Sequence, residues 1–172
     1  MSAIASFYLL PKSKSEMLVA SAQVQVQAEA LTKKKWGIFK PKLPLNPDPF
    51  WCFLDTQAKE QAEFPYSGYL LLDVDLLIEG TLLGDNTDEL ASRLSQITGS
   101  SFVTYSFESA QSTLRLLEST DVSDTTIKDL LVNEGRGEEY PEVVEPLRNA
   151  ISCLKAWLET VTNDTTGVLN IG

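Results

Sequence analysis

Short apolar runs predict β-strands at the two ends of the chain and once between them. Residues 3–10, AIASFYLL, are almost entirely apolar and are stopped by Pro11, which is the pattern of a buried strand. Residues 168–171, VLNI, follow the turn sequence TNDTTG and predict a final strand. Residues 101–105 lie within SSFVTYS, whose β-branched and aromatic residues favour a third strand.

Apolar residues at helical spacing predict helices over most of the remaining chain. Ser106 and Ser123 suit the N-cap position of two helices, and Gly99 suits the end of the helix in NTDELASRLSQITG. The segment FPYSGYLLLDVDLLIEG is strongly apolar and is interpreted as a turn followed by a buried helix. The predicted helices are about 14–30, 49–62, 71–79, 88–98, 107–118, 123–133 and 143–161.

Two helix starts carry further capping signals. Ser13 and Glu16 have the spacing of a capping box, in which each side chain bonds a backbone N–H of the first turn. Thr87 or Asn86 is the expected N-cap of the helix that ends at Gly99. Both signals place a helix start at a polar residue just before an apolar periodic segment.

The stretch DPFWCFLD, residues 48–55, places three aromatic residues within four positions. Asp48 suits an N-cap, and Pro49 suits the first helical position, where its missing N–H costs nothing. Trp51 lies about 100° from its neighbour around the helix, at the edge of the apolar face, and is a candidate surface or cleft residue. The residues that share the apolar face and are expected in the core are Phe50, Phe53, Leu54 and Ala58.

These elements predict one α+β domain over residues 1–172. Several helices are expected to pack on a small mixed or antiparallel sheet that includes the N- and C-terminal strands. A segment rich in lysine and proline at about 31–47 is expected to form an exposed loop.

The distribution of charge separates the first quarter of the chain from the rest. The net charge is −10, yet residues 1–42 hold seven of the fourteen basic residues and only two acids. The following part is therefore strongly acidic and would repel nucleic acid over most of its surface. Nucleic acid is accordingly an unlikely partner.

The residue types in the sequence disfavour many catalytic systems. The chain has no histidine, so Ser-His-Asp and Cys-His nucleophiles and histidine zinc sites are excluded as they are usually built. Its two cysteines, Cys52 and Cys153, lie in apolar helical segments, where free cysteines usually behave as small hydrophobic residues. Glycine-rich phosphate loops are also missing. We expect neither a cofactor nor a metal.

The beginning of the chain and its hydropathy favour a cytoplasmic protein without a membrane segment. The sequence MSAIASFYLLPKSKS has no basic residues before its short apolar run, unlike a signal peptide. No apolar stretch approaches the length that spans a bilayer.

Three segments together resemble a known protein family. MSAIASFYLLPKSKSEML, DPFWCFLD and ISCLKAWLETVTNDTTGVLNIG are similar to the YfbM-like family of uncharacterised bacterial proteins. The similarity covers about half the chain, mainly its ends, whereas residues 33–42 and most of 64–100 depart from it. The resemblance implies an α+β fold and a bacterial protein. It implies no activity and no catalytic residue.

Two acidic motifs are candidate metal sites. Asp73 and Asp75 would share one face of a strand and could bind a divalent cation there, but they diverge in a helix, so a structural or solvated role is preferred. GDNTDEL, residues 84–90, lacks the glycine and glutamate of a calcium loop and is interpreted as a helix start.

Aromatic and charged residues form a candidate partner or ligand surface. Tyrosine and tryptophan suit interfaces because they bury a large area at a small entropic cost. The loop GRGEEYPE could also bring paired carboxylates together for acid–base chemistry, but adjacent residues in an exposed loop rarely do this. Ser67 has no visible activating base. The candidate surface consists of Trp51, Tyr66, Tyr69, Asp73, Arg136, Glu138, Glu139 and Tyr140.

A second candidate is the basic stretch KKKWGIFKPK. Lysines alternate there with aromatic residues, as in contacts with nucleic acid or an acidic partner, whereas a solvated loop gives the same pattern. Docking on an acidic patch of another copy or of the same chain is a further alternative. The residues of this electrostatic contact loop are Lys33, Lys34, Lys35, Trp36, Lys40 and Lys42.

Three classes of function remain open from the sequence. The leading hypothesis is a non-catalytic protein-binding module, of the inhibitor or immunity type, whose acidic surface suits a basic partner. The alternative is a small-molecule-binding or hydrolytic enzyme with a carboxylate and aromatic cleft near Trp51, Tyr69 and Asp73. A homo-oligomeric structural protein is the third.

Overall fold

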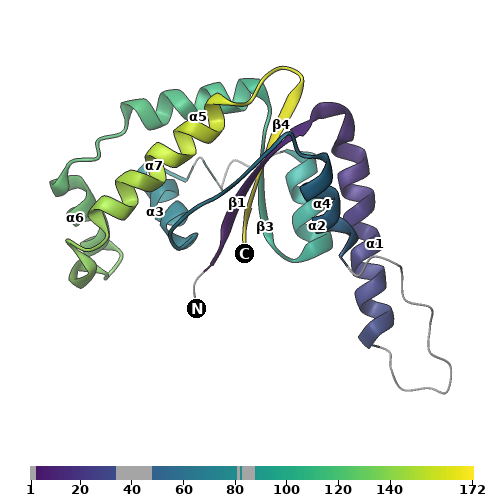
Figure 1. The fold of residues 1–172 in the computed structure, drawn as a ribbon. Coiled ribbons are helices and arrows are strands. Elements are labelled where there is room, and N and C mark those ends of the chain that lie inside the picture. Colours follow the sequence, from purple (N-terminus) through teal and green to yellow (C-terminus); the bar gives the residue numbers. More distant parts are fainter. Residues whose placement is uncertain (1–2, 34–47, 81, 83–87) are drawn as a thin grey trace.

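The computed structural model describes residues 3–33, 48–80, 82 and 88–172 (Figure 1). Its four strands form one antiparallel sheet in the order β2-β1-β4-β3. They are β1 (Ala5–Pro11), β2 (Glu60–Glu63), β3 (Ser101–Tyr105) and β4 (Thr165–Ile171). The first and last strands are therefore neighbours at the centre of the sheet. This confirms the predicted single-domain α+β fold, and of the two sheet types left open the antiparallel one is observed.

Helices lie on both sides of the sheet (Figure 1). One side carries α3 (Tyr69–Leu77), α5 (Phe107–Ser119), α6 (Asp124–Asn133) and α7 (Val144–Glu159). The other side carries α1 (Ser15–Lys33), α2 (Pro49–Gln57) and α4 (Glu89–Thr98). Two short 3₁₀ turns, η1 (Lys12–Lys14) and η2 (Gly137–Glu139), precede α1 and α7.

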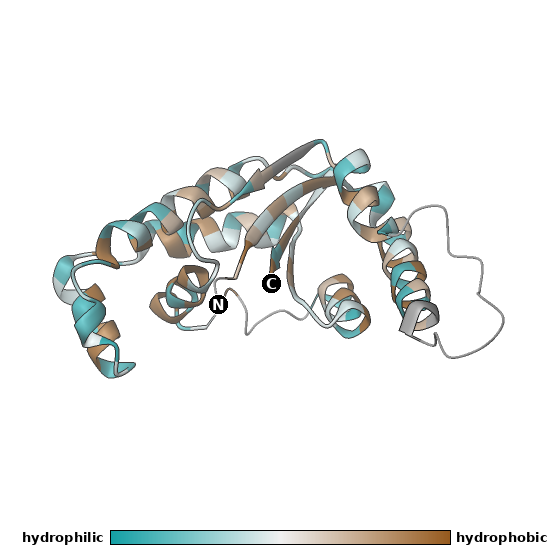
Figure 2. Ribbon diagram, turned by 60° about the horizontal axis from the view of Figure 1, so that its bottom comes forward, coloured by the Kyte–Doolittle hydropathy of each residue, from teal (hydrophilic) through white to brown (hydrophobic). Residues whose placement is uncertain are grey.

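Alternate residues of the central strands supply two separate cores. On β1, Phe7 and Leu9 pack with the helices of the α7 side, whereas Tyr8 and Leu10 pack with those of the α1 side. Side chains along a strand point to opposite faces in turn, so a strand buried on both faces must be apolar at nearly every position. Figure 2 shows brown, apolar stretches along the strands of the sheet. Burial on both faces explains why AIASFYLL has no polar alternation.

The start of α1 differs from the prediction. Ser13 and Glu16 form no capping box, because Ser13 lies within η1 and the α-helix begins at Ser15, about one residue later than predicted. Glu16 instead makes a two-point salt bridge with Arg93 of α4, with N–O distances of 3.1 and 3.3 Å. The sequence signal was correct for a helix start but wrong for the partner of the glutamate.

The start of α4 is also corrected. Its N-cap is Asp88, not Thr87 or Asn86, which lie outside the described residues. One carboxylate oxygen accepts a hydrogen bond from the N–H of Leu90 at 2.9 Å, and the other accepts one from the hydroxyl of Thr104 on β3 at 2.6 Å. A single side chain thus caps the helix and attaches it to the sheet. The predicted end at Gly99 is confirmed, with a left-handed φ of 76°.

The predicted N-caps Ser106 and Ser123 are both confirmed. Ser106 accepts a hydrogen bond from the N–H of Ser109 at 3.2 Å, and Ser123 accepts one from the N–H of Thr126 at 3.3 Å. These caps determine where α5 and α6 begin.

The helix predicted for 49–62 is shorter than expected, because α2 ends at Gln57 and β2 follows it. β2 pairs with β1, and the N–H of Lys59 already donates to the carbonyl of Leu9 at 2.7 Å. The predicted capping bond of Asp48 is not made. The side-chain oxygen of Gln25 on α1 accepts the N–H of Phe50 at 3.1 Å instead.

The outcome for the apolar residues of DPFWCFLD follows from this placement. Phe50 and Leu54 are fully buried in the core of the α1 side, as predicted. Phe53 and Ala58 pack against that core but remain half-buried. Trp51 lies at its edge and meets the ring of Phe50 edge-on, with centroids 4.9 Å apart.

Gly167, at the middle of β4, is required by the packing of the core on the α7 side. The ring of Phe7 stacks on that of Trp157, with centroids 5.4 Å apart and planes 8° from parallel. A Cβ atom on Gly167 would lie 2.7 and 2.9 Å from two ring carbons of Phe7 and 3.1 Å from a methyl of Val161. The aromatic stack therefore occupies the space that a side chain at position 167 would need.

We predict that Gly167→Ala lowers the free energy of unfolding by about 1–3 kcal/mol, because the added methyl overpacks a filled core. Urea denaturation with a fixed m-value measures the change. In a Phe7→Leu background the same Gly167→Ala change should lower the free energy of unfolding clearly less, since the ring atoms that clash with the added methyl are gone. Costs that simply add in the double variant would contradict the proposed contact.

Candidate functional site

α3 leaves apolar residues on the protein surface. Its sequence YLLLDVDLL has too few polar residues to supply a hydrophilic outer face. Leu71 and Val74 are fully buried, and the helix packs against α7. Tyr69, Leu72 and Leu76, spaced as neighbours along one stripe of a helix, remain 50%, 37% and 44% exposed. A surface helix that leaves such a stripe uncovered is a candidate contact site.

A turn after α6 brings a cation to this helix. Gly135 adopts a left-handed φ of 72°, which suits glycine, and directs the chain back so that the N–H of Arg136 donates to the carbonyl of Leu131 at 2.6 Å. The guanidinium of Arg136 then lies between two carboxylates. It donates to one oxygen of Asp73 on α3 and, in a fork with distances of 3.0 and 2.7 Å, to both oxygens of Glu139.

Asp73 is an unusual carboxylate for this surface. Its side chain is only 4% exposed, and one oxygen accepts from Arg136 while the other, Oδ2, is buried with no hydrogen-bond partner among the described residues. Burial raises the pKa of Asp73 above its ordinary value, against the lowering effect of Arg136. The same guanidinium lowers the pKa of the exposed Glu139. The ion pair thus holds a buried charge that is only partly compensated.

Two open hollows meet at this ion pair and share Tyr69, Asp73 and Arg136. The first, which we call the tyrosine hollow, has a volume of about 420 Å³. The second, the leucine hollow, has a volume of about 480 Å³. Because they share three lining residues, the two hollows are adjacent, and we call them together the trough. Besides the shared residues, Tyr66, Glu139, Glu142, Val143 and Pro146 line the tyrosine hollow, and Leu72, Leu76 and Glu134 line the leucine hollow.

Tyr66 is held in place at one end of the trough. Its hydroxyl accepts a hydrogen bond from the side-chain amide of Asn149 on α7 at 3.2 Å. Its ring packs on Phe64, with centroids 5.5 Å apart. The nearby Ser67 accepts a hydrogen bond from the N–H of Tyr69 at 3.4 Å, which places the serine at the start of α3. The aromatic wall is therefore partly ordered before anything binds.

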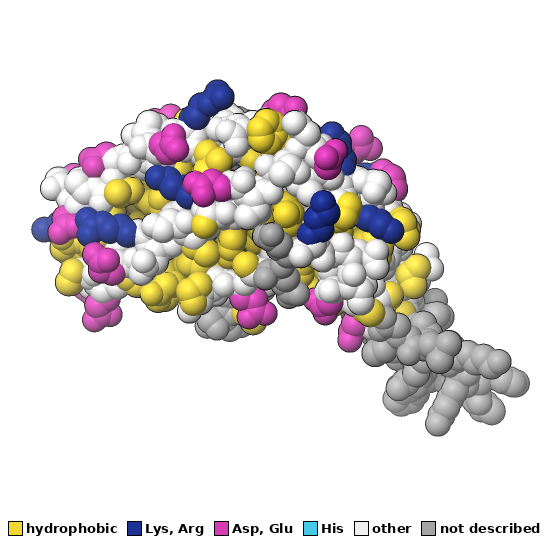
Figure 3. All heavy atoms as spheres, turned by 45° about the horizontal axis from the view of Figure 1, so that its top comes forward, with side chains coloured by type: hydrophobic (Ala, Val, Ile, Leu, Met, Phe, Trp, Pro, Cys, Tyr) yellow, Lys and Arg dark blue, Asp and Glu magenta, His cyan; other side chains and the backbone are white. Residues whose placement is uncertain are grey.

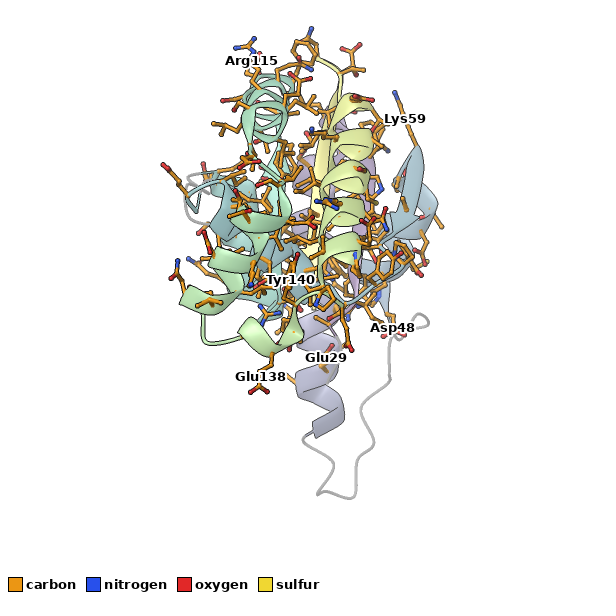
Figure 4. All side chains as sticks on the ribbon, turned by 90° about the vertical axis from the view of Figure 1, so that its left-hand side faces the viewer. Glu29, Asp48, Lys59, Arg115, Glu138 and Tyr140 are labelled. Carbon is orange, nitrogen blue, oxygen red and sulfur yellow. The ribbon has the colours of Figure 1, made fainter. Side chains whose placement is uncertain are left out.

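The structure brings together five of the eight residues proposed for a partner or ligand surface: Tyr66, Tyr69, Asp73, Arg136 and Glu139. Glu138 is excluded from this group, because it is exposed and points away from the protein (Figure 4). Tyr140 is half-buried against the core, with the ammonium of Lys128 5.8 Å from its ring centre.

Trp51 is the clearest misplacement. It belongs to α2, on the opposite side of the sheet from α3 (Figure 1). It lines a smaller pocket of about 170 Å³ together with Gln25 and Phe50. The predicted cleft near Trp51, Tyr69 and Asp73 is therefore wrong. Helical periodicity shows which face of a helix is buried, but it does not show on which side of the sheet the helix packs.

Sequence reasoning missed several residues of the trough: Leu72, Leu76, Glu134, Glu142, Val143 and Pro146. For the two leucines a signal existed, since 69, 72 and 76 have helical spacing on a helix whose only charged residues are Asp73 and Asp75. The others could not be found, because they approach α3 only through the packing of α6 and α7. Figure 3 shows one face of the protein, where apolar side chains reach the surface among acidic and basic ones.

The two aspartates of α3 serve different partners. Asp73 bonds Arg136, whereas Asp75 accepts the N–H of Leu82 at 2.7 Å. Within the described ranges, no three His, Cys, Asp or Glu side chains are grouped so that they could hold a metal ion. Of the segment GDNTDEL, residues 84–87 lie outside the described residues, and Asp88 caps α4.

Most of the electrostatic contact loop lies outside the described residues. Lys33 is the last residue of α1, and Lys34, Lys35, Trp36, Lys40 and Lys42 lie outside the described residues. Of the predicted exposed loop at about 31–47, residues 31–33 form the end of α1 instead, and residues 34–47 lie outside the described residues. Its role therefore stays a prediction.

The two cysteines are free and differ in environment. Cys52 is exposed, which corrects its expected behaviour as a buried hydrophobic residue, and Cys153 is half-buried against the core. Burial raises the pKa of the Cys153 thiol.

None of the helices in the described part of the chain combines the length and apolar composition needed to cross a bilayer.

Comparisons with known proteins found no match to this chain. No family model matches it, and no curated protein and no solved structure is significantly similar to it. The resemblance to the YfbM-like family therefore stays a prediction.

We predict that the pKa of Asp73 lies above the ordinary range of an aspartate. A pH titration that follows the carboxyl ¹³C chemical shift of Asp73 measures it. Arg136→Gln should raise the pKa of Asp73 further and also raise that of Glu139, because both lose the guanidinium. Stability should fall as pH rises from the unfolded pKa of Asp73 to its raised folded pKa, because the unfolded chain releases this proton first. A pKa of Asp73 at or below its ordinary value would contradict the described burial of this carboxylate, because the ion pair with Arg136 on its own lowers the pKa.

Proposed function

We propose that the protein is a non-catalytic protein-binding module that recognises a basic partner through the trough. The observation that carries the proposal is the exposed stripe of Tyr69, Leu72 and Leu76 beside the carboxylates of the trough. An apolar stripe supplies binding free energy, and acidic neighbours select the partner's charge.

The apolar part of the trough supports binding. Fully burying one leucine side chain stabilises a complex by roughly 1.5–3 kcal/mol, or about tenfold in affinity for each 1.4 kcal/mol. Leu72 and Leu76 lie on the same helix face and are both substantially exposed, so one partner segment could cover them together. Tyr69 joins the two hollows and adds a large aromatic surface that binding could cover.

The charges of the trough favour a basic partner over a second copy. Of the described residues that line it, Asp73, Glu134, Glu139 and Glu142 are carboxylates and only Arg136 is a cation. Two copies docked through this surface would bring like charges together at low dielectric constant. A partner rich in lysine and arginine would be steered toward the trough instead, and the net charge of −10 reinforces this attraction.

The size and charge of the chain agree with an inhibitor or immunity-type protein that neutralises a basic enzyme. We further propose a cytoplasmic location and bacterial origin, the latter supported only by the family resemblance. The enzyme alternative is weaker, because the three residues of its cleft lie on two sides of the sheet. The raised pKa of Asp73 is the observation in its favour.

The test is affinity capture from a lysate of the source cells, comparing Leu72→Asp in α3 with Leu116→Asp in α5. The two leucines are similarly exposed, at 37% and 39%, and only Leu72 lines the trough. We expect Leu72→Asp to weaken capture of one stoichiometric partner by about tenfold or more, because a carboxylate replaces a buried apolar contact.

Leu116→Asp should capture as wild type does, and high salt should weaken the complex because its charges attract across water. Circular dichroism and thermal melting check that both variants remain folded. Equal capture by the two variants, or no stoichiometric salt-sensitive partner, would reject the proposed function.

A further inference from the structure

We propose that the tyrosine hollow receives an arginine side chain of the partner. This inference rests on the proposed function and deepens it, because it names the group that the acidic part of the trough selects. It follows from the aromatic wall, the carboxylates at the mouth, and a buried oxygen without a hydrogen bond.

The wall of the hollow suits a planar cation. Tyr66 and Tyr69 both line it and are 42% and 50% exposed, so ring surface is available for contact. Guanidinium groups stack on aromatic rings and are more weakly hydrated than ammonium groups. Leu70, Val143 and Pro146 add apolar surface against which the aliphatic stem of an arginine can pack.

The acceptors of the hollow suit several N–H donors. Glu142 is exposed and can accept hydrogen bonds from a bound group. Glu139 shows how a carboxylate of this hollow binds a guanidinium, because both of its oxygens accept hydrogen bonds from Arg136. A guanidinium presents five N–H groups in a fixed plane, so it can donate to more than one carboxylate at once. A lysine ammonium is a compact, strongly hydrated charge and would leave more of this wide hollow unfilled.

Asp73 supplies an independent reason for a cation here. Its Oδ2 is buried without a hydrogen-bond partner in the described part of the chain, and the residue lines both hollows. An under-compensated buried carboxylate is costly, and a second cation nearby reduces that cost. Arg136 alone provides one bond to one of its two oxygens. The arginine of a partner would add positive charge on the tyrosine side of this group.

The experiment is an NMR titration of the full chain with three probes: N-acetyl-arginine amide, N-acetyl-lysine amide and N-acetyl-citrulline amide. Citrulline has the shape of arginine without its charge. We expect the arginine probe to shift the ring signals of Tyr66 and Tyr69 saturably, at least about threefold more tightly than the lysine probe. The citrulline probe should cause no saturable shift, and bound arginine should lower the pKa of Asp73.

Matched variants test the location. Glu142→Gln should weaken the arginine probe by about threefold to tenfold, whereas Glu118→Gln, an exposed change on α5, should leave it unchanged. An equal response to lysine or to citrulline would overturn the inference. It would also be overturned by shifts that avoid Tyr66 and Tyr69, or by no saturable shift at millimolar concentrations.

The two proposals can fail separately. If Leu72→Asp abolishes capture of a partner but the arginine probe does not bind, the trough is an interface and the arginine assignment falls. If the probe binds and no partner depends on Leu72, the hollow selects guanidinium groups and the protein-binding role falls.

Discussion

The pairing of β1 with β4 is the constraint on which the rest of the structure depends. Seven residue pairs, from Ala5 with Ile171 to Pro11 with Thr165, join the two ends of the chain at the centre of the sheet. Both strands are buried on both faces, so helices must cover the sheet on each side. The close approach of Phe7 to Gly167 further restricts this pairing, because only glycine leaves room for the aromatic stack. All other helices and strands lie in the sequence between β1 and β4, so they must pack around this central pair.

Local sequence signals predicted much of this fold. The strand at 101–105 and the helix starts after Ser106 and Ser123 are confirmed, because each depends on residues within a few positions of one another. β2 was missed because EQAE has no apolar alternation, and it becomes a strand by pairing with β1. The bond from the Phe50 N–H to the Gln25 side chain could not be predicted either, since it joins two helices separated by the lysine-rich segment.

The candidate site shows the same limit. Tyr66 and Tyr69 could be proposed from the sequence because they are close in the chain and suit interfaces. Their association with Arg136 depends on the turn at Gly135 and on the packing of α3 against α7, which no local pattern encodes. Trp51 was assigned to the same surface from its residue type and its place at the edge of a helix face, and the sheet separates it from the others. The pair Asp73 and Asp75 on α3 did not indicate a site in the sequence. Asp73 is identified as part of one only by its ion pair with Arg136 in the structure.

The central claim is that the trough is a protein-binding surface, and the most direct test is carbodiimide cross-linking in a native lysate followed by peptide mapping. This reagent joins carboxylates to amines that touch them. The account predicts cross-links from Glu134 or Glu142 to lysines of one partner, lost when the salt concentration is raised before the reagent is added. Cross-links to other proteins only through distant carboxylates such as Glu118 and Glu159, or none at all, would contradict it.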